Sequence, residues 1–164
     1  MPDNNFNCML NIPYPKITES NLNRYDTQMI LRLYADELVG IHDYIYYSIV
    51  FAETNPELAD IFECISIAEM KHFKLYAKLL YLSGINPGYK TLLPYLKKAG
   101  HGTISKNVSD AIGQLLNAEQ TSASNTRLVL SQANDASAVR VLKRIVADED
   151  HHVKILSALM KRYS

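Results

Sequence analysis

The sequence predicts an all-α protein, an antiparallel four-helix bundle with a long crossover between its second and third helices. Two observations lead to this prediction. Apolar side chains recur at spacings of three and four in four separate segments, which is the period of a helix that buries one face. The connections between these segments are short, long and short in turn, so the chain is expected to form two helical hairpins that dock through the crossover. No segment alternates as a strand does.

The first hairpin follows an extended N-terminal arm. Residues 1–20 are rich in asparagine and proline and are predicted to form this arm, while residues 21–164 form the bundle domain. The first helix is expected from the mid-20s, with Asp26 or Thr27 as its capping residue. A short break that contains a proline then leads into the second helix, which Gly84 is expected to end.

The second hairpin begins after the crossover. Residues 84–107 are rich in glycine and proline, with a short helical turn predicted at 92–98. The third helix follows this segment. A tight turn at 134–135 separates it from the fourth helix, which Ser137 is expected to begin.

Charge and cysteine content exclude several classes of function. The chain carries 17 basic and 17 acidic residues, so overall charge favours binding to neither nucleic acid nor membrane surfaces. Its two cysteines, Cys8 and Cys64, cannot build a multi-disulfide framework or a zinc ribbon, and they are expected to be free thiols in a reducing compartment. The sequence shows neither a signal peptide nor an apolar segment that could span a membrane. We therefore expect a soluble cytoplasmic protein.

Each of the four helical stripes is apolar except for a glutamate near its middle, namely Glu37, Glu69, Glu119 and Glu149. The second and fourth stripes add a histidine three positions after the glutamate, His72 and His152. Residues three apart on a helix lie on the same face, so each Glu-x-x-His pair presents a carboxylate and an imidazole inward. In both halves the pair follows the preceding glutamate by about thirty positions. One such pair arises often by chance, whereas two in register are a specific signal.

These residues predict a site for two metal ions. For any single pair, a buried Glu–His hydrogen bond is the commoner explanation, but six polar residues on four converging stripes favour a metal site. Four buried carboxylates repel one another, and two divalent cations would neutralise them. Oxygen ligands with one imidazole per ion suit iron, and manganese remains open. The expected ligands are Glu37, Glu69 and His72 for one ion and Glu119, Glu149 and His152 for the other, with Glu69 and Glu149 as bridges.

Tyr44 is the expected catalytic residue beside this site. It lies two helical turns after Glu37 on the same face, where it could hydrogen-bond a ligand or serve as a local electron donor. Packing in the core is the alternative role for this side chain. The remaining histidines are not expected to be ligands, because His42 and His151 point away from the stripes and His101 lies in the crossover.

The helices that carry these residues resemble the ligand helices of bacterioferritins and rubrerythrins, which belong to the ferritin-like di-iron carboxylate superfamily. The resemblance covers about residues 25–162. It implies a ferritin-like bundle whose chemistry couples the oxidation of ferrous iron to the reduction of peroxide or dioxygen. The segments that carry it are Glu37-Leu-Val-Gly-Ile-His-Asp-Tyr44, Glu69-Met-Lys-His72 and Asp148-Glu149-Asp-His-His152.

Departures from these families narrow the expectation. Ser122 stands where rubrerythrins usually carry a further glutamate, and the chain has no rubredoxin-type CxxC pairs, so electrons would come from a separate donor protein. The six-ligand set is closer to bacterioferritins. Met70 occupies the position of a haem ligand there, but an interface role explains it and haem is not expected. The chain ends soon after His152, without the fifth helix of cage-forming ferritins, so a homodimer is expected.

The sequence therefore predicts an oxidoreductase with two iron ions per chain that reduces hydrogen peroxide or dioxygen, at the expense of ferrous iron or an external donor. Three alternatives remain open. The first is a dimanganese protein with catalase-like activity. The second is a non-catalytic protein that binds or stores iron, and the third is a structural protein that uses the metal ions as a staple.

Overall fold

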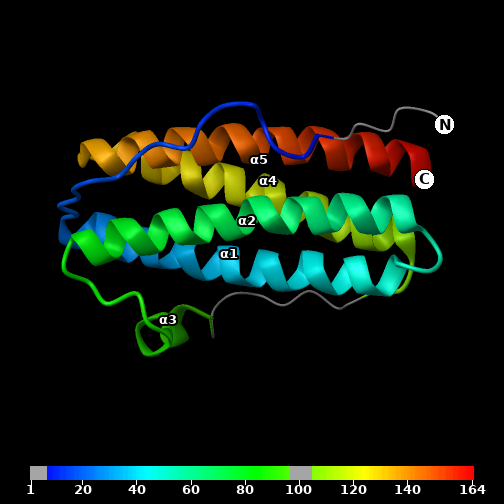
Figure 1. Ribbon diagram of the computed structural model, residues 1–164, viewed down its shortest axis with the longest axis horizontal. Coiled ribbons are helices and arrows are strands. Elements are labelled where there is room, and N and C mark those ends of the chain that lie inside the picture. Colours follow the sequence, from blue (N-terminus) through cyan, green and yellow to red (C-terminus); the bar gives the residue numbers. More distant parts are fainter. Residues whose placement is uncertain (1–6, 97–104) are drawn as a thin grey trace.

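The computed structural model describes residues 7–96 and 105–164, and these residues form five helices and no strand (Figure 1). The predicted all-α architecture with four long helices is confirmed. The helices are α1 (Arg24–Phe51), α2 (Pro56–Leu82), α3 (Tyr89–Leu96), α4 (Val108–Gln132) and α5 (Ala136–Tyr163). Within the described part of the chain, no helix is long and apolar enough to cross a lipid bilayer.

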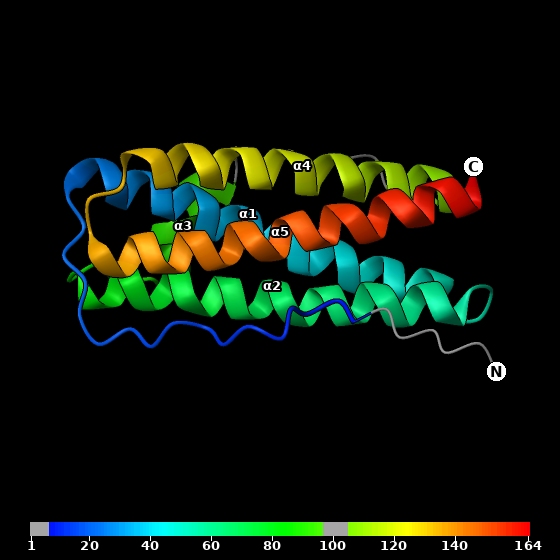
Figure 2. The same cartoon turned by 90° about the horizontal axis from the view of Figure 1, so that it is seen from above.

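The four long helices form two hairpins that pack side by side (Figures 1 and 2). Helix α1 packs mainly against α2, and α4 packs mainly against α5, while α1–α4 and α2–α5 contacts join the two hairpins. The short helix α3 lies in the crossover and contacts α1. It overlaps the predicted turn at 92–98, of which residues 97 and 98 lie outside the described residues.

Asparagine and aspartate side chains cap α1 and α5, at least two positions earlier than expected from the sequence. The side chain of Asn23 accepts a hydrogen bond of 2.8 Å from the backbone N–H of Asp26, so Asp26 and Thr27 lie in the first turn of α1 and do not cap it. Asp135 caps α5 in the same way, and Ser137 lies within the first turn. Both corrections follow the preference for a short polar side chain just before the first helical residue.

The expected end of α2 is correct. Gly84 follows the last turn with a φ of 79°, a left-handed conformation that glycine adopts without steric cost.

The apolar core consists of two separate clusters. One gathers residues from the start of α1, the end of α2 and the start of α5, including Ile30, Leu79 and Leu142. The other gathers residues from the end of α1, the start of α2 and the end of α5, including Phe62 and Leu156. On every long helix, the predicted polar ligand falls between the parts that contribute to the two clusters. The bundle is therefore closed by apolar packing on both sides of a polar middle layer.

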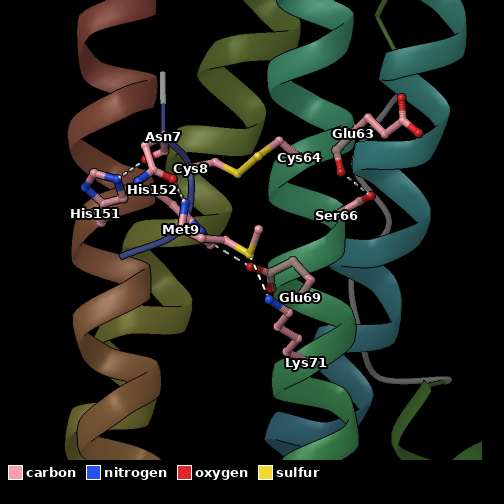
Figure 3. Close-up of a disulfide and its surroundings, with 10 residues drawn as sticks. All are labelled: Asn7, Cys8, Met9, Glu63, Cys64, Ser66, Glu69, Lys71, His151 and His152. Atoms are coloured by element: carbon pink, nitrogen blue, oxygen red, sulfur yellow. Dashed lines mark hydrogen bonds and ion pairs between the residues drawn. A yellow bond between two sulfur atoms is a disulfide. The ribbon is translucent and has the colours of Figure 1, made fainter. Parts of the chain in front are cut away.

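The N-terminal arm runs along α5 and α2 before α1 begins (Figures 1 and 2), and its described residues 7–23 form no helix. Cys8 on the arm forms a disulfide with Cys64 on α2, with 6.0 Å between the Cα atoms (Figure 3). The expectation of two free thiols was wrong, because the arm folds back along α2 and brings together two cysteines that are 56 positions apart. A disulfide that closes a loop of this length lowers the chain entropy of the unfolded state, which would stabilise the folded state by about 4 kcal/mol.

Candidate metal centre

The six predicted ligand side chains lie together in the polar middle layer of the bundle. Each of the four long helices contributes at least one of them, and none is more than 5% exposed. The contributors are Glu37 from α1, Glu69 and His72 from α2, Glu119 from α4, and Glu149 and His152 from α5.

The side chains form two groups that share Glu69. The first group holds Glu37, Glu69, His72 and Glu149, and its ligand atoms all lie within 4.8 Å of one another. The Nδ1 atom of His72 is 3.6 Å from Glu37 Oε2, 3.7 Å from Glu69 Oε1 and 3.6 Å from Glu149 Oε1. The imidazole thus faces three carboxylates at once.

The second group holds Glu69, Glu119 and His152. The Nδ1 atom of His152 is 3.2 Å from Glu69 Oε1 and 3.5 Å from Glu119 Oε2. A position between the two groups suits the bridging role that the sequence suggests for Glu69. The sequence predicts that Glu149 binds mainly the ion of His152. In the structure Glu149 lies in the group of His72 instead, because the Oε1 atom of Glu149 points toward the His72 imidazole on α2.

The unpaired atoms of these side chains fit a pair of cations. Within the six ligand side chains, eight buried donor or acceptor atoms have no hydrogen-bond partner; they are Glu37 Oε2, Glu69 Oε1, His72 Nδ1, Glu119 Oε2, both Glu149 oxygens and both His152 ring nitrogens. Buried polar atoms without partners are costly and therefore rare. Two ligands bonded to one ion at about 2.1 Å lie about 3 to 3.4 Å apart, close to the separations found here. Carboxylates with one imidazole per group suit iron or manganese.

Comparison with known families agrees with this geometry. Residues 27–164 match the model of the ferritin-like domain. The chain belongs to the ferritin-like family. No curated protein sequence matches the chain. In this ferritin-like protein the family match covers α2 to α5 and all but the first three residues of α1, and therefore every residue of the two ligand groups.

The ring nitrogen of His72 that points away from the ligand group contacts Asp148, a residue that was not predicted to belong to the site. His72 Nε2 lies 2.9 Å from Asp148 Oδ2, and Asp148 is fully buried. An Nε2–H that donates to this carboxylate leaves the Nδ1 lone pair directed at the ligand group. Asp148 directly precedes Glu149, and that adjacency is the signal that could have identified it. His152 has no such partner, since its Nε2 is unpaired among the described residues.

Tyr44 lies against the second group of this ferritin-like site. Its hydroxyl donates a hydrogen bond to Glu119 Oε1, and the tyrosine is buried. Burial, followed by the charges of Glu119 and Glu69, raises the pKa of Tyr44 well above its ordinary value. The phenol therefore keeps its proton at neutral pH and holds it toward the site.

The other histidines lie away from the centre. His42 is hydrogen-bonded to Asp43 on the surface of α1, with 2.9 Å between Nδ1 and Oδ1. The Nε2 atom of His151 lies 2.6 Å from the backbone oxygen of Asn7 on the arm. His101 lies outside the described residues.

Without cations, burial and the neighbouring charges strongly shift the pKa values of the ligand side chains. Burial and then the neighbouring carboxylates raise the pKa of Glu37 and of Glu149 well above the ordinary value. Burial acts in the same direction on Glu69, but the charge of His72 and the close approach of both imidazoles hold its pKa well below the ordinary value. Burial lowers the pKa of His152, yet the charge of Glu119 and the close approach of Glu119 and Glu69 outweigh this effect and raise the pKa to about 10. Protons thus occupy this layer when metal does not.

The shared position of Glu69 predicts how the ligands divide between the ions. Wild-type protein should bind about two metal ions per chain, Glu69→Ala about none, and His152→Ala about one, because only Glu69 belongs to both groups. Elemental analysis of protein loaded with ferrous iron or manganese measures these ratios. His42→Ala is the control and should bind as the wild type does. Equal loading of the Glu69→Ala variant and the wild type would contradict the assignment.

The raised pKa values predict that the metal-free protein loses stability as pH rises. His152 is protonated in both folded and unfolded chains below its ordinary pKa of 6.5, and its contribution to stability is then complete. That contribution is lost as pH rises from 6.5 to about 10, and Glu37 and Glu149 act with the same sign. The melting temperature of metal-free protein should therefore fall across this range, while saturation with metal should reduce the fall. A melting temperature that rises with pH in the metal-free protein would contradict this account.

Proposed function

We propose that this ferritin-like protein is a di-metal oxidoreductase that reduces hydrogen peroxide or dioxygen, with iron as its expected metal and manganese as the alternative. The observation that carries the proposal is the pair of buried ligand groups, which have Glu69 in common and whose facing nitrogen and oxygen atoms lack hydrogen-bond partners. A purely structural core would pair these atoms with one another or replace them by apolar groups.

Two redox-active ions at this site would supply electrons and an electrostatic anchor for a bound oxidant. Six side chains cannot complete the coordination of two six-coordinate ions even when the carboxylates bridge, which leaves room for a small oxidant. Reduction of one hydrogen peroxide to two waters takes two electrons and two protons. Ferrous iron, or a separate electron-donor protein, is the proposed source of the electrons.

Residues around the site orient the ligand side chains and hold a proton beside them. Asp148 orients the imidazole of His72 through Nε2, and the apolar clusters on both sides keep bulk water away from the layer. Tyr44 holds a proton at Oη against Glu119 Oε1, close to the second ligand group. This hydrogen bond orients Glu119 and offsets part of its negative charge, so Tyr44 acts on the second ligand group through that carboxylate.

The finer relationship within the family forms part of this proposal. The ligand set of four glutamates and two histidines resembles that of bacterioferritins, and Ser122 at the position of the additional rubrerythrin glutamate argues against ligand exchange at that point. A rubrerythrin-like activity would thus run on the six ligands alone.

Rapid mixing of the ferrous protein with hydrogen peroxide, and separately with dioxygen, tests the proposed activity. We expect repeated turnover when a reductant is present, and Tyr44→Phe should slow the oxidation by about tenfold or more without loss of metal, because the hydrogen bond that orients Glu119 is removed. Tyr47→Phe is the matched control; its buried hydroxyl donates to Gln114 Oε1 at 2.7 Å, away from the ligand groups. A single round of iron oxidation without further turnover would contradict the enzyme and favour a protein that binds or stores iron.

We also propose that the chain forms a homodimer. Apolar side chains on one stripe of α1, Ile45 and Ile49, are 39% and 70% exposed, and Ile67 and Met70 on the neighbouring helix α2 are 39% and 43% exposed. Exposed apolar groups on adjacent helices are typical of a subunit interface. Native mass spectrometry should give a dimer, and Ile49→Lys should shift it toward monomer. A monomeric wild type or a cage of many subunits would contradict this proposal.

A further inference from the structure

We propose that the N-terminal arm, residues 7–23, is a working part of the metal centre, in which Tyr14 is a positioning residue for His72 and the Cys8–Cys64 disulfide holds the arm in place. This inference rests on the proposed di-metal function and extends it to a segment outside the bundle. If the inference is correct, oxidation or reduction of the Cys8–Cys64 pair changes metal binding at the ligand group of His72.

The arm reaches the metal ligand through one shared carboxylate oxygen. The hydroxyl of Tyr14 donates to Asp148 Oδ2 at 2.8 Å, and Nε2 of His72 lies 2.9 Å from the same oxygen. The ring of Tyr14 also stands edge-on to the His72 imidazole, with 6.3 Å between the centroids. Tyr14 is therefore one residue removed from a ligand of the first group, and its hydrogen bond helps to determine where Oδ2 points.

Arg144 connects the arm to the same carboxylate. Its guanidinium forms an ion pair with Asp148 Oδ1 and lies 4.2 Å from the centroid of the Tyr14 ring. It also donates to two backbone oxygens of the arm, at 3.2 Å to Ile12 and 3.5 Å to Leu10. Arg144 is only 6% exposed, so these contacts are shielded from water. The path of the arm and the orientation of Asp148 are thus set by one buried network.

The disulfide anchors the arm six positions before Tyr14 (Figure 3). Non-covalent contacts also hold this end: Cys8 and Met9 pack against the apolar cluster around Phe62, Lys71 Nζ donates to Met9 Sδ at 3.0 Å, and His151 contacts the backbone of Asn7. The far end of the arm is held by Asp135, which accepts a hydrogen bond of 2.8 Å from the backbone of Asn21. Tyr14 therefore lies between a covalent anchor and a non-covalent one.

Cleavage of the disulfide removes the covalent anchor. A dithiol reductant would supply two electrons and two protons, giving two thiols on the chain and a disulfide on the reductant. In a compartment where thiols are kept reduced, the arm would be locked only under oxidising conditions. Those are the conditions in which a peroxide-reducing centre is needed.

The test compares Tyr14→Phe with the wild type, each with the disulfide intact and reduced. Tyr34→Phe is the matched control, because its buried hydroxyl donates to the backbone oxygen of Pro87 at 3.1 Å and not to the ligand network. Titration with manganese alone, followed by calorimetry, measures binding at the two groups. Hydrogen exchange of the His72 Nε2–H, followed by NMR in the metal-free protein, measures the order of the network without metal.

In Tyr14→Phe we expect about threefold to tenfold weaker manganese binding at one of the two sites, less than the 10–100-fold that loss of a direct ligand partner typically costs. The His72 Nε2–H should exchange faster in the same variant. Reduction of the wild type should produce both changes, and reduction of Tyr14→Phe should add little, because the two act through one network.

Three results would overturn the inference. The first is unchanged manganese binding and unchanged Nε2–H exchange in Tyr14→Phe. The second is equal weakening at both sites, which would make the arm a general cover. The third is an effect of reduction that is as large in Tyr14→Phe as in the wild type. A wild type that binds no manganese and no iron would instead contradict the proposed function, and the exchange of the His72 Nε2–H would still decide the role of the arm.

Discussion

The burial of four carboxylates in one layer of the bundle is the constraint on which the rest of the structure depends. Each buried charge costs several kcal/mol unless it is paired, and here the carboxylates outnumber the two imidazoles that face them. Protons can relieve part of this repulsion, as the raised pKa values of Glu37 and Glu149 indicate. Two cations would relieve it more fully and would also bind the imidazole nitrogens that lack hydrogen-bond partners. The apolar clusters on the two sides of the layer stabilise the bundle and shield the layer from water.

Most of the fold and the candidate ligands could be predicted from the sequence because both follow from helical periodicity. A glutamate such as Glu69 in the middle of an apolar stripe must face the core, and a histidine three positions later must face it too. Prediction of these inward-facing residues needed only the local spacing along each helix, and the structure brings the residues together as predicted. The division of ligands was harder to predict, since Glu149 and His72 come from different helices and meet only through the packing of α2 against α5.

The path of the arm and its contacts could not be predicted, because an extended segment has no periodicity that fixes where it runs. Cys8 and Cys64 are 56 positions apart, and nothing in their spacing shows that the arm returns along α2. Tyr14 meets Asp148 for the same reason. These contacts make the site asymmetric: His72 has a carboxylate and an arm behind it, whereas His152 has neither among the described residues. The two repeated halves of the sequence thus give two chemically distinct ligand groups.

Anomalous X-ray scattering from crystals of iron-loaded protein tests the central claim most directly, because it locates the ions without reference to the side chains. The account predicts two peaks about 3.5 to 4 Å apart in the middle layer of the bundle, one against Nδ1 of His72 and one against Nδ1 of His152, with Glu69 between them. Fully loaded crystals that show iron only on the surface, or no iron inside the bundle, would contradict it.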